Sequence, residues 1–185
     1  MKLTSSNFAA AIGLSPWQSR QKLYRVMQGI EPRDPMNSAM QWGIDHELDA
    51  VAGVEAHTGI MFDFTGKNQR HLAVDVDGLT LGSTPDGSCG STGCEVKCPG
   101  KLPDEIPPHY VPQIMGQCLI AGFDSVFFSS WTMDEQRIWI VPRSEEYIAF
   151  MLPHLREFMD YIESDTEPKR RKKPAPPEIN HERIL

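Results

Sequence analysis

The middle of the chain is a cluster of short strand-like segments, with helix-like segments before and after it. Residues 70–76, RHLAVDV, alternate between polar and apolar side chains, as a half-buried strand does. Asp77-Gly78 is a hairpin turn signal, and residues 79–83 follow as the partner strand. A further short strand is expected over residues 95–98. These segments must form a sheet that other elements cover.

Apolar spacing and capping residues predict the helices. They are expected over residues 8–12, 15–29, 39–57, 110–121 and 144–164. In the third of these, Ile44, Leu48 and Val51 recur at helical spacing as a core-facing stripe. Two more strands, residues 123–131 and 137–141, lie between the last two helices. This order predicts a small α/β sheet with helices on both sides.

The 185 residues are the length of one domain, which we expect to span residues 1–165. Residues 166–185 are rich in proline around a basic run at 169–173, and their composition predicts a disordered tail. No stretch has the length of a membrane helix, and the N-terminus does not read as a signal peptide. We therefore expect a cytoplasmic protein without membrane contact.

The chain carries 18 basic and 25 acidic residues, a net charge of −7. Bulk charge of this sign excludes a generic polyanion binder. Nucleic-acid binding would need a local basic patch or carboxylates that recruit divalent cations. The run at 169–173 could supply phosphate contacts, but a solubilising tail or a docking segment for a partner explains it equally well.

Four cysteines stand at positions 89, 94, 98 and 118. Their C-x4-C and C-x3-C spacings do not fit paired zinc knuckles, and no histidine follows at ligand spacing. A zinc or iron–sulfur site is the alternative, but reduced structural cysteines are favoured.

The chemistry-bearing pattern is Asp86, followed by Glu95-Val96-Lys97. Residues two apart on a strand share a face, so Glu95 and Lys97 point the same way and Val96 points into the core. Asp86 ends the neighbouring turn, where its carboxylate can meet Glu95. Two converging carboxylates bind hard cations such as Mg²⁺. A lysine beside them can hold water or neutralise developing charge.

Such a pattern also arises by chance, as a hairpin with one surface acid and a strand with an exposed Glu–Lys pair. What favours a site is the set of segments around it. They are LTSS at residues 3–6, AMQWGIDHELDA at 39–50 with HTG at 57–59, STPDG at 83–87, EVKCP at 95–99 and YVPQ at 110–113.

In order and spacing, these segments resemble the PD-(D/E)xK nucleases and, more narrowly, the phage lambda-exonuclease family, also called YqaJ-like viral recombinases. The resemblance runs from about residue 3 to residue 158. It implies a restriction-endonuclease-like core, in which a central mixed β-sheet is flanked by α-helices.

The resemblance also implies roles for individual residues. Asp86, Glu95 and the Val96 carbonyl would bind one or two Mg²⁺ ions, with Mn²⁺ as a substitute, and Lys97 would be the catalytic lysine. Glu47 resembles the helix-borne acid that completes the site. Its spacing from Ile44 and Val51 puts it beside the apolar stripe, although an ordinary solvated glutamate has the same spacing.

On the same resemblance, Gln113 would position the scissile phosphate or water, and Gln117 is a second candidate. Thr4 and Ser6 would lie near a terminal 5′ phosphate, where a helix N-terminus suits an anion, although a plain N-cap serine is equally compatible. The family's upstream arginine has no counterpart here. Arg20, Lys22 or Arg25 are expected as substitutes.

Trp17 and Met40 could stack on bases or split strands, but packing in a core or interface is favoured for both. The implied activity is a Mg²⁺-dependent 5′-to-3′ exonuclease on linear duplex DNA. It would leave 3′ single-stranded overhangs for recombination. The resemblance further implies a ring-shaped homotrimer, a single-strand annealing protein as partner, and a phage or prophage origin in a bacterial host.

Two alternatives remain open at this point. One is an endonuclease or single-strand-directed nuclease of the same fold, motivated by the missing arginine. The other is a DNA-binding scaffold with a decayed site.

Overall fold

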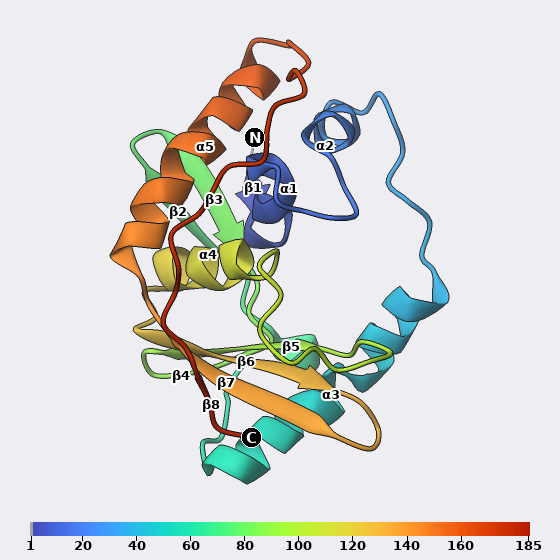
Figure 1. The fold of residues 1–185 in the computed structure, drawn as a ribbon, viewed down its shortest axis with the longest axis vertical. Helices are drawn as coiled ribbons and strands as arrows, with labels where there is room; N and C mark the ends of the chain where they lie inside the picture. The colour runs from blue at the N-terminus through green and yellow to red at the C-terminus, as the bar shows by residue number, and fades with distance from the viewer. Residues whose placement is uncertain (1) are drawn as a thin grey trace.

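The computed structural model describes residues 2–185 and contains two β-sheets with helices between and around them (Figure 1). The helices are η1 (Ser5–Asn7), α1 (Phe8–Ile12), α2 (Arg20–Met27), α3 (Ser38–Thr58), η2 (Gly66–Asn68), α4 (Val111–Ala121) and α5 (Glu145–Glu163). The strands are β1 (Leu3–Thr4), β2 (Leu72–Val76), β3 (Leu79–Ser83), β4 (Gly87–Cys89), β5 (Thr92–Lys97), β6 (Ser125–Trp131), β7 (Gln136–Pro142) and β8 (Glu182–Arg183).

The smaller sheet has the strand order β1-β3-β2 and contains the expected hairpin. Asp77 and Gly78 both have positive φ, 51° and 82°, as a two-residue hairpin turn requires. β1 pairs in parallel with β3, so that Leu3 lies opposite Leu81. The N-terminal segment is thereby fixed against the central hairpin.

The larger sheet has the order β4-β5-β6-β7-β8. β5 and β6 are parallel and the other neighbours are antiparallel, so the sheet is mixed, as expected. The single central sheet of the prediction is divided into two, because the chain leaves β3 at Ser83 and begins β4 at Gly87 in a different sheet.

Helices cover both faces of the larger sheet (Figure 1). α4 contacts both sheets, and together with α1 and α5 it forms the main core around Phe8, Met115 and Phe158. α3 packs on the opposite face, over a smaller core that includes Val51 and Val96. The helices predicted on both sides of a sheet are confirmed.

The second helix begins later than expected. Ser15 accepts hydrogen bonds from the backbone of Trp17 and Gln18 and forms a turn instead of a helix cap. The helix begins at Arg20, where the Ser19 hydroxyl accepts from the Lys22 N–H. The capping chemistry was predicted correctly, but the wrong serine was assigned to it.

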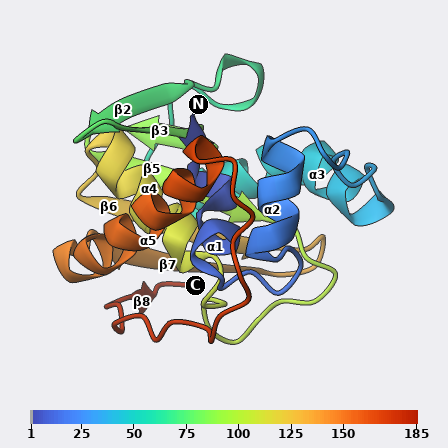
Figure 2. The same cartoon turned by 90° about the horizontal axis from the view of Figure 1, so that it is seen from above.

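The expected core stripe of α3 is only partly buried. Ala50, Val51 and Val54 are buried, whereas Ile44 is 56 % and Leu48 is 55 % exposed. Figure 2 shows α3 extending outward from the rest of the fold. Within residues 2–185, nothing covers the apolar face of the first half of this helix fully.

The segment expected to be a disordered tail lies along the body (Figures 1 and 2). Arg171 contacts Glu157, and Ile179 packs against the main core. Residues 182–183 form β8 on the edge of β7, and the Ile184 N–H donates to the Ile138 carbonyl at 2.8 Å. This placement differs from disorder, although the segment has no helix or strand before β8. The division at residue 165 stays a prediction.

None of the helices within residues 2–185 is both long enough and apolar enough to cross a membrane. Cys94 and Cys118 are buried, Cys98 is half-buried and Cys89 is exposed, and all four are free thiols.

Candidate active site

β5 directs its side chains to two different helices. Cys94 and Val96 belong to the core beneath α3. Glu95 and Lys97 face the opposite side, where α4 lies. The alternation predicted from the sequence is confirmed, and it places one carboxylate and one ammonium group side by side.

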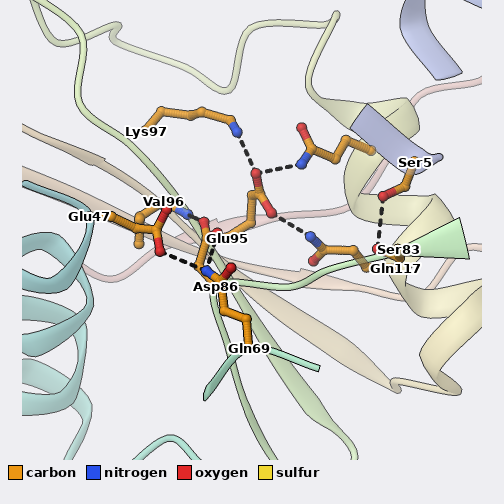
Figure 3. Close-up of polar contacts among 10 residues, drawn as sticks. Ser5, Glu47, Gln69, Ser83, Asp86, Glu95, Val96, Lys97 and Gln117 are labelled. Carbon is orange, nitrogen blue, oxygen red and sulfur yellow. Dashed lines mark hydrogen bonds and ion pairs between the residues drawn. The ribbon is translucent and has the colours of Figure 1, made fainter. Parts of the chain in front are cut away.

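Glu95 is 2 % exposed and is surrounded by hydrogen-bond donors (Figure 3). The Lys97 ammonium and the Gln117 amide contact its two oxygens. Gln113 Nε2 also donates to Glu95 Oε1, at 2.6 Å. Gln113 and Gln117 are one turn apart on α4, so the helix presents both amides to the same carboxylate. Gln117 was a secondary candidate by sequence, yet it is fully buried against Glu95.

Asp86 lies in the short crossing between the two sheets. Its backbone N–H continues the β4–β5 ladder by donating to the Cys94 carbonyl at 3.0 Å. Its carboxylate accepts a 2.8 Å hydrogen bond from the Val96 N–H (Figure 3). The N–H and C=O of one strand residue point to the same side of the strand. The Val96 carbonyl therefore points to the side of β5 on which Asp86 lies.

Glu47 reaches the same region from α3 (Figure 3). The Gln69 amide donates to Glu47 Oε1 at 2.6 Å and to Asp86 Oδ1 at 3.3 Å. One side-chain amide thus joins the helix-borne acid to the acid of the crossing. The three acids come from α3, the crossing and β5, and the structure brings them into one neighbourhood.

Burial and neighbouring charges shift the pKa values of these groups. Burial, followed by the nearby Glu95 charge, raises the pKa of Asp86 well above its ordinary value. The same two causes raise the pKa of Glu47. Burial alone would lower the pKa of Lys97, but the charges of Glu95 and Asp86 outweigh it and raise the pKa. Lys97 is therefore a cation at neutral pH.

The donor set fits a hard divalent cation. It consists of three carboxylates and a backbone carbonyl, and oxygen is the ligand atom that Mg²⁺ and Mn²⁺ prefer. Burial first and the neighbouring Glu95 charge second raise the pKa values of Glu47 and Asp86, and a bound cation would oppose both causes. The Gln69 amide joins Glu47 to Asp86, whereas Glu95 is held separately by Lys97, Gln113 and Gln117. Across residues 2–185, no three carboxylate, imidazole or thiol groups are already gathered tightly enough to hold an ion.

A cavity of about 770 Å³ opens beside Gln113. Thr4 and Ser6 line it, and their hydroxyls are 3.1 Å apart. Their place near a 5′ phosphate stays a prediction. Trp17 and Met40 also line the cavity and are 70 % and 48 % exposed. These two residues are therefore not in a core of the described chain, although the Trp17 ring contacts that of His109 at 4.4 Å between centroids. Packing in an interface stays a prediction for both.

Arg20 and Arg25 are not brought to this cavity, contrary to expectation. Arg20 is 5 % exposed and pairs with Glu157 at 3.3 Å, so it serves the packing of α2 on α5. Arg25 pairs with Glu167 at 2.7 Å. Lys22 pairs with Asp34 at 2.6 Å and does not line the cavity either.

Sequence reasoning missed four residues of the site. Gln69 lies in a loop with no motif around it, and no signal marks it. Lys2 and Arg33 are the basic residues along the cavity wall, and their positions beside LTSS and before α3 were the available hints. The Tyr110 ring lies 5.5 Å from the Lys97 ammonium, a cation–π distance. Tyr110 belonged to a quoted segment but had no assigned role.

Comparison with known proteins adds a family and a fold. The sequence model of the YqaJ-like viral recombinase domain matches residues 1–124. No curated protein matches the chain.

Several solved structures are similar to it. An alkaline exonuclease from Laribacter hongkongensis, LHK-Exo, has 23% identity, coverage of 89% of both chains and a TM-score of 0.69. The same enzyme in complex with dAMP has 22% identity, 89% coverage of both chains and a TM-score of 0.70. A phage-related exonuclease from Haemophilus somnus has 12% identity, a TM-score of 0.67, and coverage of 89% of this chain and 94% of its own. At these identities the structures establish the fold.

Proposed function

Because the chain belongs to the YqaJ-like viral recombinase family of nucleases and has the restriction-endonuclease-like fold of phage-type exonucleases, we propose that it is a Mg²⁺-dependent 5′-to-3′ exonuclease. It digests one strand of linear double-stranded DNA and leaves a 3′ single-stranded overhang. The observation that carries this proposal is the meeting of Asp86, Glu95 and Lys97 at β5, in a chain of this family.

In this proposal, Asp86, Glu95, Glu47 and the Val96 carbonyl hold the Mg²⁺, and Mn²⁺ substitutes. A bound divalent cation supplies Lewis-acid activation of water and stabilisation of the leaving oxygen. Such oxygen donors accept either ion.

Side chains of the protein orient the water and the phosphate. Lys97, held as a cation by Glu95, orients water beside the phosphate and stabilises the negative charge that develops on it. It does not act as a base while it is protonated. Gln113 donates from its amide and positions the phosphate or the water.

The cavity beside Gln113 receives the DNA end. Thr4 and Ser6 supply hydroxyls, and Lys2 and Arg33 supply positive charge along the same wall. These two residues take the role that the sequence gave to Arg20 and Arg25. Recognition of a 5′ phosphate would then depend on Lys2 and Arg33, because a phosphate prefers cationic donors.

We also propose that the active form is a homotrimeric ring. The first half of α3 leaves Met40, Ile44 and Leu48 exposed, and apolar patches of this kind mark interfaces. A ring can gather its positive charge in the channel, which would reconcile DNA binding with a net charge of −7.

The overhang product requires a protein that coats it, so a single-strand annealing protein is the proposed partner. The proposed setting is phage-type recombination in the cytoplasm of a bacterial host. Both statements rest on the family to which the chain belongs.

The test is digestion of linear duplex DNA with Mg²⁺, with a label on one 5′ end. Phosphorylated and hydroxyl 5′ ends are compared, and a closed circle is included. We expect loss of label from the linear phosphorylated substrate and none from the circle. Cutting of the circle would favour an endonuclease, and no cleavage with retained binding would favour a scaffold.

A pair of variants tests the phosphate contact. Lys2→Ala with Arg33→Ala should reduce the preference for a phosphorylated end. Arg25→Ala, which removes a surface charge outside the cavity, is the matched control and should leave the preference unchanged.

A further inference from the structure

Residues 60–69 form a brace between α3 and β4. At its start, the Phe62 N–H donates to Glu55 of α3 at 2.8 Å. In its middle, Asp63 and Ser88 of β4 exchange two backbone hydrogen bonds, of 2.8 Å and 3.1 Å. The brace is therefore fixed to the helix that carries Glu47 and to the strand that follows Asp86.

The second half of the brace is fixed as well. Gly66 has a φ of 54° and lies so close to α3 that an added Cβ would be 3.1 Å from Leu48 Cδ2. Leu48 is the neighbour of Glu47. The Gln69 N–H donates back to the Gly66 carbonyl at 3.2 Å and closes this turn. These contacts determine where the Gln69 side chain begins.

Gln69 ends the brace between two acids that repel each other. Its Nε2 is 2.6 Å from Glu47 Oε1 and 3.3 Å from Asp86 Oδ1 (Figure 3). Because one NH₂ group has two hydrogens, it can serve both carboxylates. The Glu47 charge helps to raise the pKa of Asp86, and the hydrogen bond from Gln69 acts to lower the pKa of Glu47, so an amide donor between the two carboxylates offsets part of the repulsion.

We propose that Gln69 is a positioning residue of the metal site. It holds Glu47 and Asp86 together before a divalent cation binds, so less rearrangement is needed on binding. This inference rests on the proposed function, in which Glu47 and Asp86 are metal ligands. Outer-shell residues that hold ligands in place contribute about 10–100-fold to metal affinity.

The test measures metal affinity and not only activity. Gln69→Met keeps the length of the side chain and removes the donor. Isothermal titration of Mn²⁺ at pH 8 should give a Kd about 10-fold weaker than that of the wild type. The matched control is Gln41→Met on α3, because Gln41 also donates to a carboxylate, that of Asp45 at 2.8 Å, on an exposed surface. Its Kd should equal the wild-type value.

A second variant keeps the proposal falsifiable if Gln69→Met fails to fold. Gln69→Asn retains the amide but withdraws it by one carbon–carbon bond. It should also weaken Mn²⁺ binding while its melting temperature in EDTA stays near that of the wild type. A wild-type Kd in either variant would overturn the positioning role. So would a lowered melting temperature with an unchanged Kd, since this pattern indicates a merely structural contact.

The two proposals can fail separately. If the wild type binds Mn²⁺ and digests linear DNA but the Gln69 variants bind Mn²⁺ as tightly, only the positioning role is wrong. If the wild type neither binds Mn²⁺ nor cuts DNA, the proposed nuclease function fails, and the role of Gln69 falls with it.

Discussion

The backbone N–H of Val96 donates a 2.8 Å hydrogen bond to the carboxylate of Asp86 and ties the crossing between the sheets to β5. Asp86→Asn keeps an oxygen that can accept this bond and removes the charge. We expect nuclease activity to fall by more than about 100-fold, because a metal ligand is lost. The melting temperature in EDTA at pH 8 should stay level or rise. A large fall in that temperature would show that the charge stabilises the fold.

The raised pKa of the Asp86 carboxyl predicts that the stability of the fold depends on pH. The folded pKa of Asp86 lies above its ordinary value of 3.8. At pH values between 3.8 and the folded pKa, the folded state therefore binds more protons than the unfolded state. Stability then decreases as pH rises from about 3.8 through the raised folded pKa. The melting temperature of Asp86→Asn minus that of the wild type, in EDTA, should grow over this pH range. A constant difference would contradict the raised pKa.

Lys97→Ala should abolish cleavage and leave DNA binding intact. It also leaves Glu95, which is 2 % exposed, without its cation. Glu95 keeps its hydrogen bonds from Gln113 and Gln117, so we expect the loss of one charge-assisted hydrogen bond, about 2 kcal/mol of unfolding free energy. Electrophoretic mobility shifts, cleavage assays and urea melts separate the three effects. Retained turnover would overturn the catalytic role of Lys97.

Gly53 and Gly43 offer a matched pair of substitutions on α3. A Cβ on Gly53 would lie 1.9 Å from Gln136 Oε1, whereas one on Gly43 would meet nothing within 4 Å. Gln136 donates to the Ala50 carbonyl and to Ser129, each at 2.8 Å, and so joins α3 to the sheet.

Gly43→Ala should stabilise the chain by up to about 1 kcal/mol through helix propensity. Gly53→Ala should be about 1–2 kcal/mol less stable than Gly43→Ala, because the Gln136 bonds are disturbed. Denaturant melts of the two variants measure this difference directly. Equal stabilities would show that Gln136 can move aside without loss.

The exposed face of α3 predicts the effect of a charge on assembly. Ile44→Lys should reduce the mass seen by light scattering from that of a trimer to that of a monomer, because a lysine in an apolar interface is desolvated. Ile30→Lys is the control, since Ile30 is 63 % exposed and follows α2, outside α3. A trimer that survives Ile44→Lys would place the interface elsewhere.

The features that could be predicted from the sequence depend mainly on residues that are close together along the chain. The alternation of β5 put Glu95 and Lys97 on one face without reference to any other element, and the hairpin at Asp77-Gly78 follows from the φ values that its residues tolerate. The family segments pointed to Glu47 and Gln113, which the structure brings to the same neighbourhood. Their roles stay predictions.

The features that could not be predicted depend on contacts with residues that are distant in the sequence. Apolar spacing showed that α3 has an apolar face, but it could not show that Ile44 and Leu48 remain uncovered. Arg20 resembled a surface cation because the sequence does not reveal its partner Glu157 on α5. Gln69 reaches Glu47 and Asp86 only through a loop whose path is set by contacts with α3 and β4.

Residues 84–86, between β3 and β4, belong to neither strand, yet they include Asp86. Opening these residues breaks the hydrogen bonds of Asp86 with Cys94 and Val96 but leaves the pairing of β5 with β6 intact, and such local openings require less free energy than global unfolding. In the metal-free protein, heat should therefore open this part of the metal site at a temperature below that at which the sheets melt. Amide hydrogen exchange would show this opening first at Thr84, at Asp86 and at Val96, whose N–H has Asp86 as its partner.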